Sequence, residues 1–149
     1  MRNFAYTMML LALGTWIGAM LFFGAAVAPT VFAVLSGSGS GRSLAGDIVG
    51  RSLTLLHALG FTCGVIFFVG TQISQRVSRL ASGLVLGMLV LTAASELAIS
   101  PRVRALRAQI AREDAARQSF DRWHATSTAV EGVVLLGGLG AFGSAAKRN

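Results

Sequence analysis

The chain has 149 residues, of which 54% are hydrophobic and 13% are charged, and its mean hydropathy is +0.67. A water-soluble domain carries about 25% charged residues, so this composition excludes an ordinary soluble protein. The formal net charge is +7. No nucleic-acid-binding motif accompanies that charge, and the basic residues flank apolar blocks, as they do in membrane proteins. We therefore expect membrane lipids as partners and no nucleic acid.

Four apolar blocks each reach the length of about 20 residues that crosses a bilayer. They predict an all-α protein, a four-helix transmembrane bundle forming a single integral membrane domain over residues 1–149, with helices at about 4–35, 48–73, 80–99 and 120–146. We expect the first block to be retained, because a signal-peptide core has only roughly 7–15 apolar residues. The richness in Ala, Gly and Arg favours a multi-pass protein of the plasma membrane, in particular a bacterial inner membrane.

The connections between the blocks carry their own signals. Asp47 can cap the second helix after a Ser/Gly-rich turn. Between the third and fourth blocks, Ser100 and Pro101 resemble a new helix start. The polar stretch from there to Arg122 predicts an amphipathic helix that lies at the membrane surface. A solvated connector is the alternative interpretation of this stretch.

Glycine pairs four residues apart recur inside the apolar blocks. This spacing lets the backbones of membrane helices approach closely. It occurs at Gly14 and Gly18, Gly60 and Gly64, and Gly83 and Gly87. The pattern predicts a tightly packed bundle, and it makes a homo-oligomer through Gly-rich helix faces a further expectation.

Ionisable side chains inside a membrane cost at least about 2.5–3.5 kcal/mol at a helix centre, so those that persist usually face the bundle interior and often have a function. Alternating helix directions bring the few in this chain to the same side of the membrane: Arg51, His57, Glu96, Asp121, His124 and Glu131. The fourth helix also carries Ser127 beside the stripe formed by His124 and Glu131. We therefore predict a ligand-binding pocket near one membrane face, built from Arg51, His57, Glu96, His124, Ser127 and Glu131.

Three interpretations of these residues stay open. The groups can satisfy one another in a non-catalytic scaffold subunit, since buried charges are normally paired. They can bind or transport a cation, with His57, His124, Glu96 and Glu131 as ligands of a divalent metal or as a proton relay. A b-type haem held by the two histidines is the third, which gives a membrane redox protein. Binding or transport of a cation or small solute is the function we predict.

An enzyme is not favoured. The sequence contains no phosphate-binding loop, no nucleophile elbow and no Cys/His metal cluster. We therefore assign no catalytic residue.

Several short motifs resemble one family in order along the chain. They are Ala28-Pro29 with Phe32, Gly46, His57, Pro101-Arg102, and the pattern F-x-x-x-H-x-x-S formed by Phe120, His124 and Ser127. Together they resemble the transmembrane protein 205-like family, small four-helix membrane proteins with a domain of unknown function. The resemblance implies a multi-pass location and a poorly defined role, linked in some members to the handling of metal-containing or toxic compounds. Where that family usually has asparagine seven residues after the helix-four histidine, this chain has Glu131.

Overall fold

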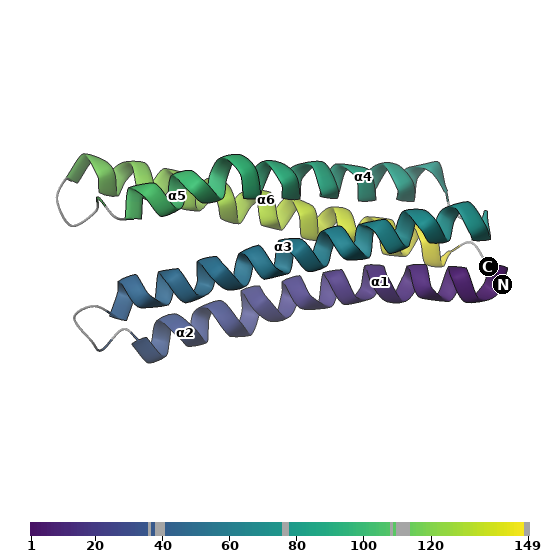
Figure 1. The fold of residues 1–149 in the computed structure, drawn as a ribbon, viewed down its shortest axis with the longest axis horizontal. Helices are drawn as coiled ribbons and strands as arrows, with labels where there is room; N and C mark the ends of the chain where they lie inside the picture. Colours follow the sequence, from purple (N-terminus) through teal and green to yellow (C-terminus); the bar gives the residue numbers. More distant parts are fainter. Residues whose placement is uncertain (36, 38–40, 76–77, 108, 110–113, 148–149) are drawn as a thin grey trace.

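The computed structural model describes residues 1–35, 37, 41–75, 78–107, 109 and 114–147, and within these ranges the regular structure is helical, with no strand. Four helical rods are long and apolar enough to cross a membrane: Arg2–Leu35, Ser43–Ser74, Arg79–Arg107 and Gln118–Ala146. The chain is therefore a multi-pass membrane protein built as an all-α bundle, as predicted. Both chain ends lie at one end of the bundle, which we call the closed end, and the opposite end is the open end (Figure 1).

The four rods pair into two hairpins (Figure 1). The first hairpin contains α1 (Arg2–Phe22), a π-helical turn η1 (Phe23–Val27), α2 (Ala28–Leu35) and α3 (Gly41–Ser74). The second contains α4 (Arg79–Ala94), a π-helical turn η2 (Ser95–Ile99), α5 (Ser100–Arg107) and α6 (Asp114–Ala146). Within the hairpins, α1 and α2 pack on α3, and α4 and α5 pack on α6; between them, α1 meets α6 and α3 meets α4.

Each π turn ends two residues before a proline, η1 before Pro29 and η2 before Pro101. A proline lacks the backbone N–H, and its ring collides with the carbonyl four residues earlier in an α-helix. At both sites the residue before the proline donates its N–H to a carbonyl five residues earlier. This wider turn relieves the collision, so each rod continues through its proline.

The predicted amphipathic helix from Pro101 to Arg122 is not a separate element among the described residues. Ser100 has helical backbone angles, φ −57° and ψ −41°, so it does not cap a new helix. Because η2 accommodates the proline, the third rod runs on to Arg107 rather than ending near Ile99. The polar stretch is thus divided between the end of the third rod and the beginning of α6.

The predicted beginning of the second helix is also wrong. Helix α3 begins at Gly41 rather than near Ile48, and most of the preceding Ser/Gly-rich turn lies outside the described residues. Asp47 therefore lies in the second turn of α3 and is not a cap. Its Oδ1 instead accepts a hydrogen bond from Nη1 of Arg107 at 3.2 Å, which joins the two hairpins at the open end.

The closed half of the bundle contains the buried hydrophobic core. The largest fully buried side chains include Trp16, Phe67 and Met9, the last two with no exposed surface. Near the chain ends, the phenol of Tyr6 donates a hydrogen bond to the carbonyl of Ala145 at 2.9 Å. By contrast, η1 and α2, which lie toward the open end, contain no buried residue. The core therefore occupies one half of the bundle.

The three glycine pairs differ in how closely their surroundings pack. A Cβ at Gly14 would make an ordinary contact of 3.8 Å with Phe142, and one at Gly18 would have nothing within 4 Å. A Cβ at Gly60 would lie 2.6 Å from the indole of Trp16, and one at Gly64 would lie 2.7 Å from Leu89. Their predicted role in close helix packing is confirmed. Gly83 and Gly87 lie exposed on α4, where a Cβ would have nothing within 4 Å. A homo-oligomer through such faces stays a prediction.

We expect Gly60→Ala to destabilise the bundle, because the indole of Trp16 is enclosed and cannot move aside. Overpacking of this kind costs about 1–3 kcal/mol. The measurement is the free energy of unfolding in mixed micelles of dodecyl maltoside and dodecyl sulfate. Gly83→Ala is the matched control, and a gain of helix propensity without overpacking should leave it equal to or slightly above the wild type. Equal losses in both variants would contradict the close contact at Gly60.

Candidate functional site

His57 lies between two carboxylates. Its Nδ1 is 2.8 Å from Oε2 of Glu96, and its Nε2 is 2.8 Å from Oε1 of Glu131. Only 3% of the His57 side chain is exposed, against 22% for Glu96 and 20% for Glu131. His57 belongs to α3, Glu96 to η2 and Glu131 to α6. This His57 triad therefore links the two hairpins through one buried imidazole.

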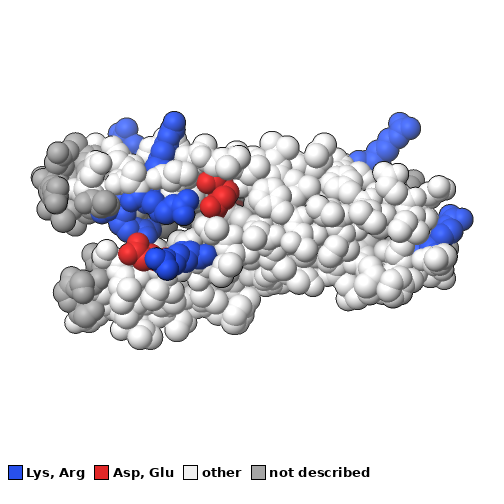
Figure 2. Space-filling view, in the orientation of Figure 1, with Lys and Arg blue, Asp and Glu red and all other residues white. Residues whose placement is uncertain are grey.

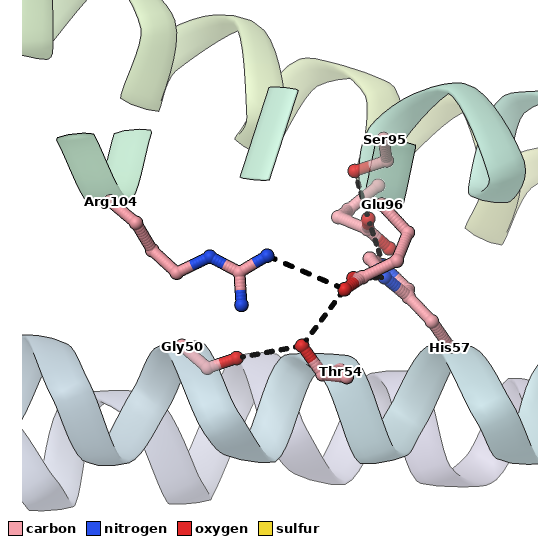
Figure 3. Close-up of polar contacts among 7 residues, drawn as sticks. Gly50, Thr54, His57, Ser95, Glu96 and Arg104 are labelled. Carbon is pink, nitrogen blue, oxygen red and sulfur yellow. Dashed lines mark hydrogen bonds and ion pairs between the residues drawn. The ribbon is translucent and has the colours of Figure 1, made fainter. Parts of the chain in front are cut away.

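Neighbouring groups support each carboxylate of the triad. The hydroxyl of Thr54 donates a hydrogen bond to Oε1 of Glu96 at 3.1 Å, and Arg104 approaches the same oxygen with Nη2 at 3.7 Å (Figure 3). The hydroxyl of Ser95 donates to Oε1 of Glu131 at 3.2 Å. The ion pair with Arg104 is longer than a hydrogen bond, so it is the loosest contact of the cluster.

The geometry of the triad fixes the number of protons it holds. Each of the two nitrogen–oxygen contacts needs one proton between its atoms, whether a ring N–H or a carboxyl O–H donates it. The triad with both hydrogen bonds made therefore carries two such protons. Its net charge is then −1, either with an imidazolium and two carboxylates or with a neutral imidazole, one carboxylate and one carboxylic acid. The guanidinium of Arg104 balances this charge.

A cavity of about 550 Å³ lies between the hairpins toward the open end. All four rods contribute to its wall, and Glu131 of the triad is part of it. Other polar groups in the wall are Ser100, Arg104 and Arg107 from α5, and His124, Ser127 and Thr128 from α6. Most of the remaining wall is apolar and includes Met20, Phe23, Phe32, Leu53, Leu56 and Leu135. Figure 2 shows a recess between the hairpins at this end, with basic and acidic side chains around it.

The structure brings together only part of the predicted site. His57, Glu96 and Glu131 meet, whereas His124 and Ser127 line the cavity, and their side chains make no hydrogen bond to the triad among the described residues. The ring of His124 stacks on Phe120 instead, with centroids 5.7 Å apart. Arg51 is exposed and makes no ion pair with any described residue. Arg104, and not Arg51, is the cation beside Glu96.

Sequence reasoning missed four contributors to this region. Thr54 and Ser95 carry a usable signal, because Thr54 is one turn before His57 on the same helix face and Ser95 immediately precedes Glu96. Arg104 and Arg107 were assigned to the surface of a separate interfacial helix. Their place in the cavity wall follows from the continuous third rod, which the apolar pattern does not predict.

The metal and haem interpretations need donors that the triad already uses. Within the described ranges, no group of three or more His, Cys, Asp or Glu side chains is arranged to hold a metal ion. The two nitrogens of an imidazole point away from each other, so the glutamates sit at different edges of the ring rather than around one point. Axial ligation of a haem by His57 would require the loss of one of its two hydrogen bonds. Binding of a divalent metal or haem by His57 and His124 stays a prediction.

Comparison with known proteins gives one result. The sequence model of a family described as a domain of unknown function, DUF4149, matches residues 11–112. This range contains His57, Glu96 and Arg104, whereas Glu131 lies beyond it. No curated protein and no solved structure matched the chain.

We expect His57→Leu to lower the free energy of unfolding by up to about 3–5 kcal/mol, because it leaves two carboxylates largely buried without their shared partner. The triple variant His57→Leu, Glu96→Leu, Glu131→Leu should recover most of this loss, since apolar replacement of a whole buried charge cluster is often neutral or stabilising. Unfolding in mixed micelles measures both.

His124→Leu makes the same change at an exposed histidine and should stay within about 0.5 kcal/mol of the wild type. A triple variant as unstable as His57→Leu would show that the imidazole stabilises by packing and not by pairing with the glutamates.

Proposed function

We propose that this chain, which belongs to the DUF4149 family of domains of unknown function, binds or transports a small solute or cation through the cavity near one membrane face. One observation carries the proposal. Glu131 lies in the cavity wall and also holds His57, so a solute in the cavity would sit against a buried hydrogen-bonded cluster. Ionisable groups that line a cavity within a membrane bundle commonly mark a solute or ion pathway.

The dimensions of the cavity support this role. Its volume of about 550 Å³ falls within the roughly 300–1,000 Å³ of small-molecule pockets, which combine a mainly apolar wall with a few polar groups. In the closed half of the bundle, the described helices pack closely through Trp16, Phe67 and the contact at Gly60. Access from one membrane face follows from this asymmetry.

The finer placement in the transmembrane protein 205-like family, and in a bacterial inner membrane, is part of the proposal. The family placement is supported by the structural roles of the resembling residues. Pro29 and Pro101 follow the two π turns. A Cβ at Gly46 would lie 2.6 Å from the guanidinium of Arg107, so this glycine makes room for a side chain of the cavity wall. His57 is the centre of the triad.

A cation is the second candidate, and the proton is the one that the triad favours. A continuous chain of hydrogen bonds begins at Glu131 in the cavity wall, passes through His57 and ends at Glu96, which pairs with Arg104. Chains of carboxylates and imidazoles of this kind relay protons in membrane proteins. A divalent metal would have to displace these hydrogen bonds.

For the proton candidate, we expect Glu131→Gln to abolish translocation while the bundle still assembles. The amide can accept the hydrogen bond of His57 but cannot take up and release a proton. Proteoliposomes containing a pH-sensitive dye, driven by a potassium diffusion potential, measure the rate. The wild type should acidify the lumen faster than protein-free liposomes, and the variant should not. Equal rates for the two proteins would exclude the proton candidate.

For the solute candidate, we expect photoreactive amphiphiles to label the cavity wall. The probes are hexadecanol and hexadecanoic acid, each carrying a diazirine on its chain, in phosphatidylcholine liposomes. At least one should label Leu53 and Leu135 in the wall, in addition to lipid-facing Leu136. Peptide mapping by mass spectrometry distinguishes these sites.

Gly132→Leu places a large side chain in the cavity, where a Cβ meets nothing within 4 Å. It should remove labelling of Leu53 and Leu135 and preserve that of Leu136. Gly83→Leu, on the outer face of α4, is the matched control. Labelling of the cavity wall that Gly132→Leu leaves unchanged would contradict a binding cavity.

A further inference from the structure

The cavity is polarised along the bundle axis. Helix α6 runs from the open end toward the closed end, so Leu135 lies roughly 16 Å deeper than His124 at about 1.5 Å per residue. Leu56 and Met20 join Leu135 in the apolar part of the wall. Arg104 and Arg107 belong to α5, whose last residue is Arg107 at the open end. The cavity therefore has an apolar interior and a basic rim.

The two arginines lie one turn apart on α5, and both line the cavity. Arg104 is 54% exposed, and its one ion pair with a described residue is the 3.7 Å contact with Glu96. Arg107 is mostly buried, lies over the backbone of Gly46, and donates from Nη1 to Asp47. A guanidinium has five N–H donors in a planar fork. The hydrogen bonds to described residues use one donor of Arg107 and none of Arg104.

Spare guanidinium donors select for an oxyanion. The planar fork matches a carboxylate or a phosphate, which can accept two parallel hydrogen bonds. The triad and Arg104 together are neutral, and so are Arg107 and Asp47 as a pair, so the acidic groups of the wall already have partners. A cationic headgroup at the rim would face two guanidinium groups that offer N–H donors and no acceptor. An oxyanion headgroup would instead accept hydrogen bonds from the unused N–H donors of the two arginines.

We propose that the cavity takes an amphiphile with an oxyanion headgroup, its chain among the apolar residues and its headgroup on Arg104 and Arg107. This inference rests on the proposed binding of a small solute in the cavity and specifies the chemistry of that solute. A bilayer supplies such molecules in two forms, a free fatty acid and an anionic phospholipid. A free inorganic oxyanion would leave the apolar interior of the cavity without a partner.

The matched photoreactive acid and alcohol test the headgroup, because they share one chain. At alkaline pH, where the acid is ionised, it should label Leu53 and Leu135 at concentrations at least about tenfold below those that the alcohol needs, since a charged hydrogen bond contributes about 1.5–3 kcal/mol. The double variant Arg104→Gln, Arg107→Gln should lower labelling by the acid to the level of the alcohol and leave the alcohol unchanged. Circular dichroism and size-exclusion chromatography confirm that the variant is folded.

Arg102→Gln is the matched control. Arg102 is on the same helix, but its guanidinium lies 4.5 Å from the ring centroid of Trp123, and it is not among the residues of the cavity wall. This variant should retain the preference for the acid. Loss of the preference in Arg102→Gln to the same extent would show a general surface-charge effect and overturn the assignment to Arg104 and Arg107.

The remaining outcomes separate this inference from the proposed function. Equal labelling by acid and alcohol would overturn the oxyanion headgroup and leave the binding cavity intact. Labelling of Leu136 alone would overturn both. Displacement of the acid by inorganic phosphate would overturn the requirement for an apolar chain. Weaker labelling by the acid in liposomes that contain phosphatidylglycerol would identify an anionic phospholipid as the natural occupant. Unchanged labelling would identify a single-chain acid. Both outcomes support an anionic amphiphile.

Discussion

A hydrogen-bonding side chain inside a bilayer must find its partners within the protein, because lipid tails offer none. In this bundle, His57 finds them across the space between the hairpins. Its two ring nitrogens point in different directions, and each is 2.8 Å from a carboxylate of the second hairpin. One imidazole thus sets the separation and the relative depth of α3, η2 and α6. Rotation of any of the three helices would break a hydrogen bond that nothing else in the membrane replaces.

Two different kinds of contact divide the bundle at the triad. On the closed side, glycine lets helices approach until Gly60 touches the indole of Trp16. Toward the open end, both π turns precede their prolines, and each turn widens its rod. The hairpins are then joined by long polar side chains, such as the pair Arg107 and Asp47, which leave room between the backbones. The cavity is a consequence of this change from glycine packing to side-chain bridges.

The sequence predicts the helices well because lipid imposes one strong signal, an uncharged block of about 20 residues. It also predicts that His57 and Glu131 lie on the same side of the membrane, since this follows from the alternating directions of the helices. Rotation about the helix axis is not predictable in the same way. At about 100° per residue, Arg104 would point some 80° away from Glu96 in an uninterrupted α-helix. A π turn contains one extra residue, so it brings Arg104 back to within about 20° of Glu96. The pattern of apolar residues does not predict that turn.

The carboxylate of Glu131 explains why the triad needs a cation such as Arg104 beside it. If an amide stood at position 131 and its oxygen accepted the ring N–H of His57, then His57 and Glu96 would form a neutral pair. Replacing the amide by a carboxylate adds one negative charge to a site that is largely enclosed by apolar side chains. Arg104 lies beside Glu96 rather than beside Glu131. The positive charge of Arg104 therefore balances the added negative charge of Glu131 through the imidazole, which is hydrogen-bonded to both carboxylates. The acid on α6 and the arginine on α5 therefore act as one unit, and the continuation of the third rod beyond Pro101 is what allows it to form.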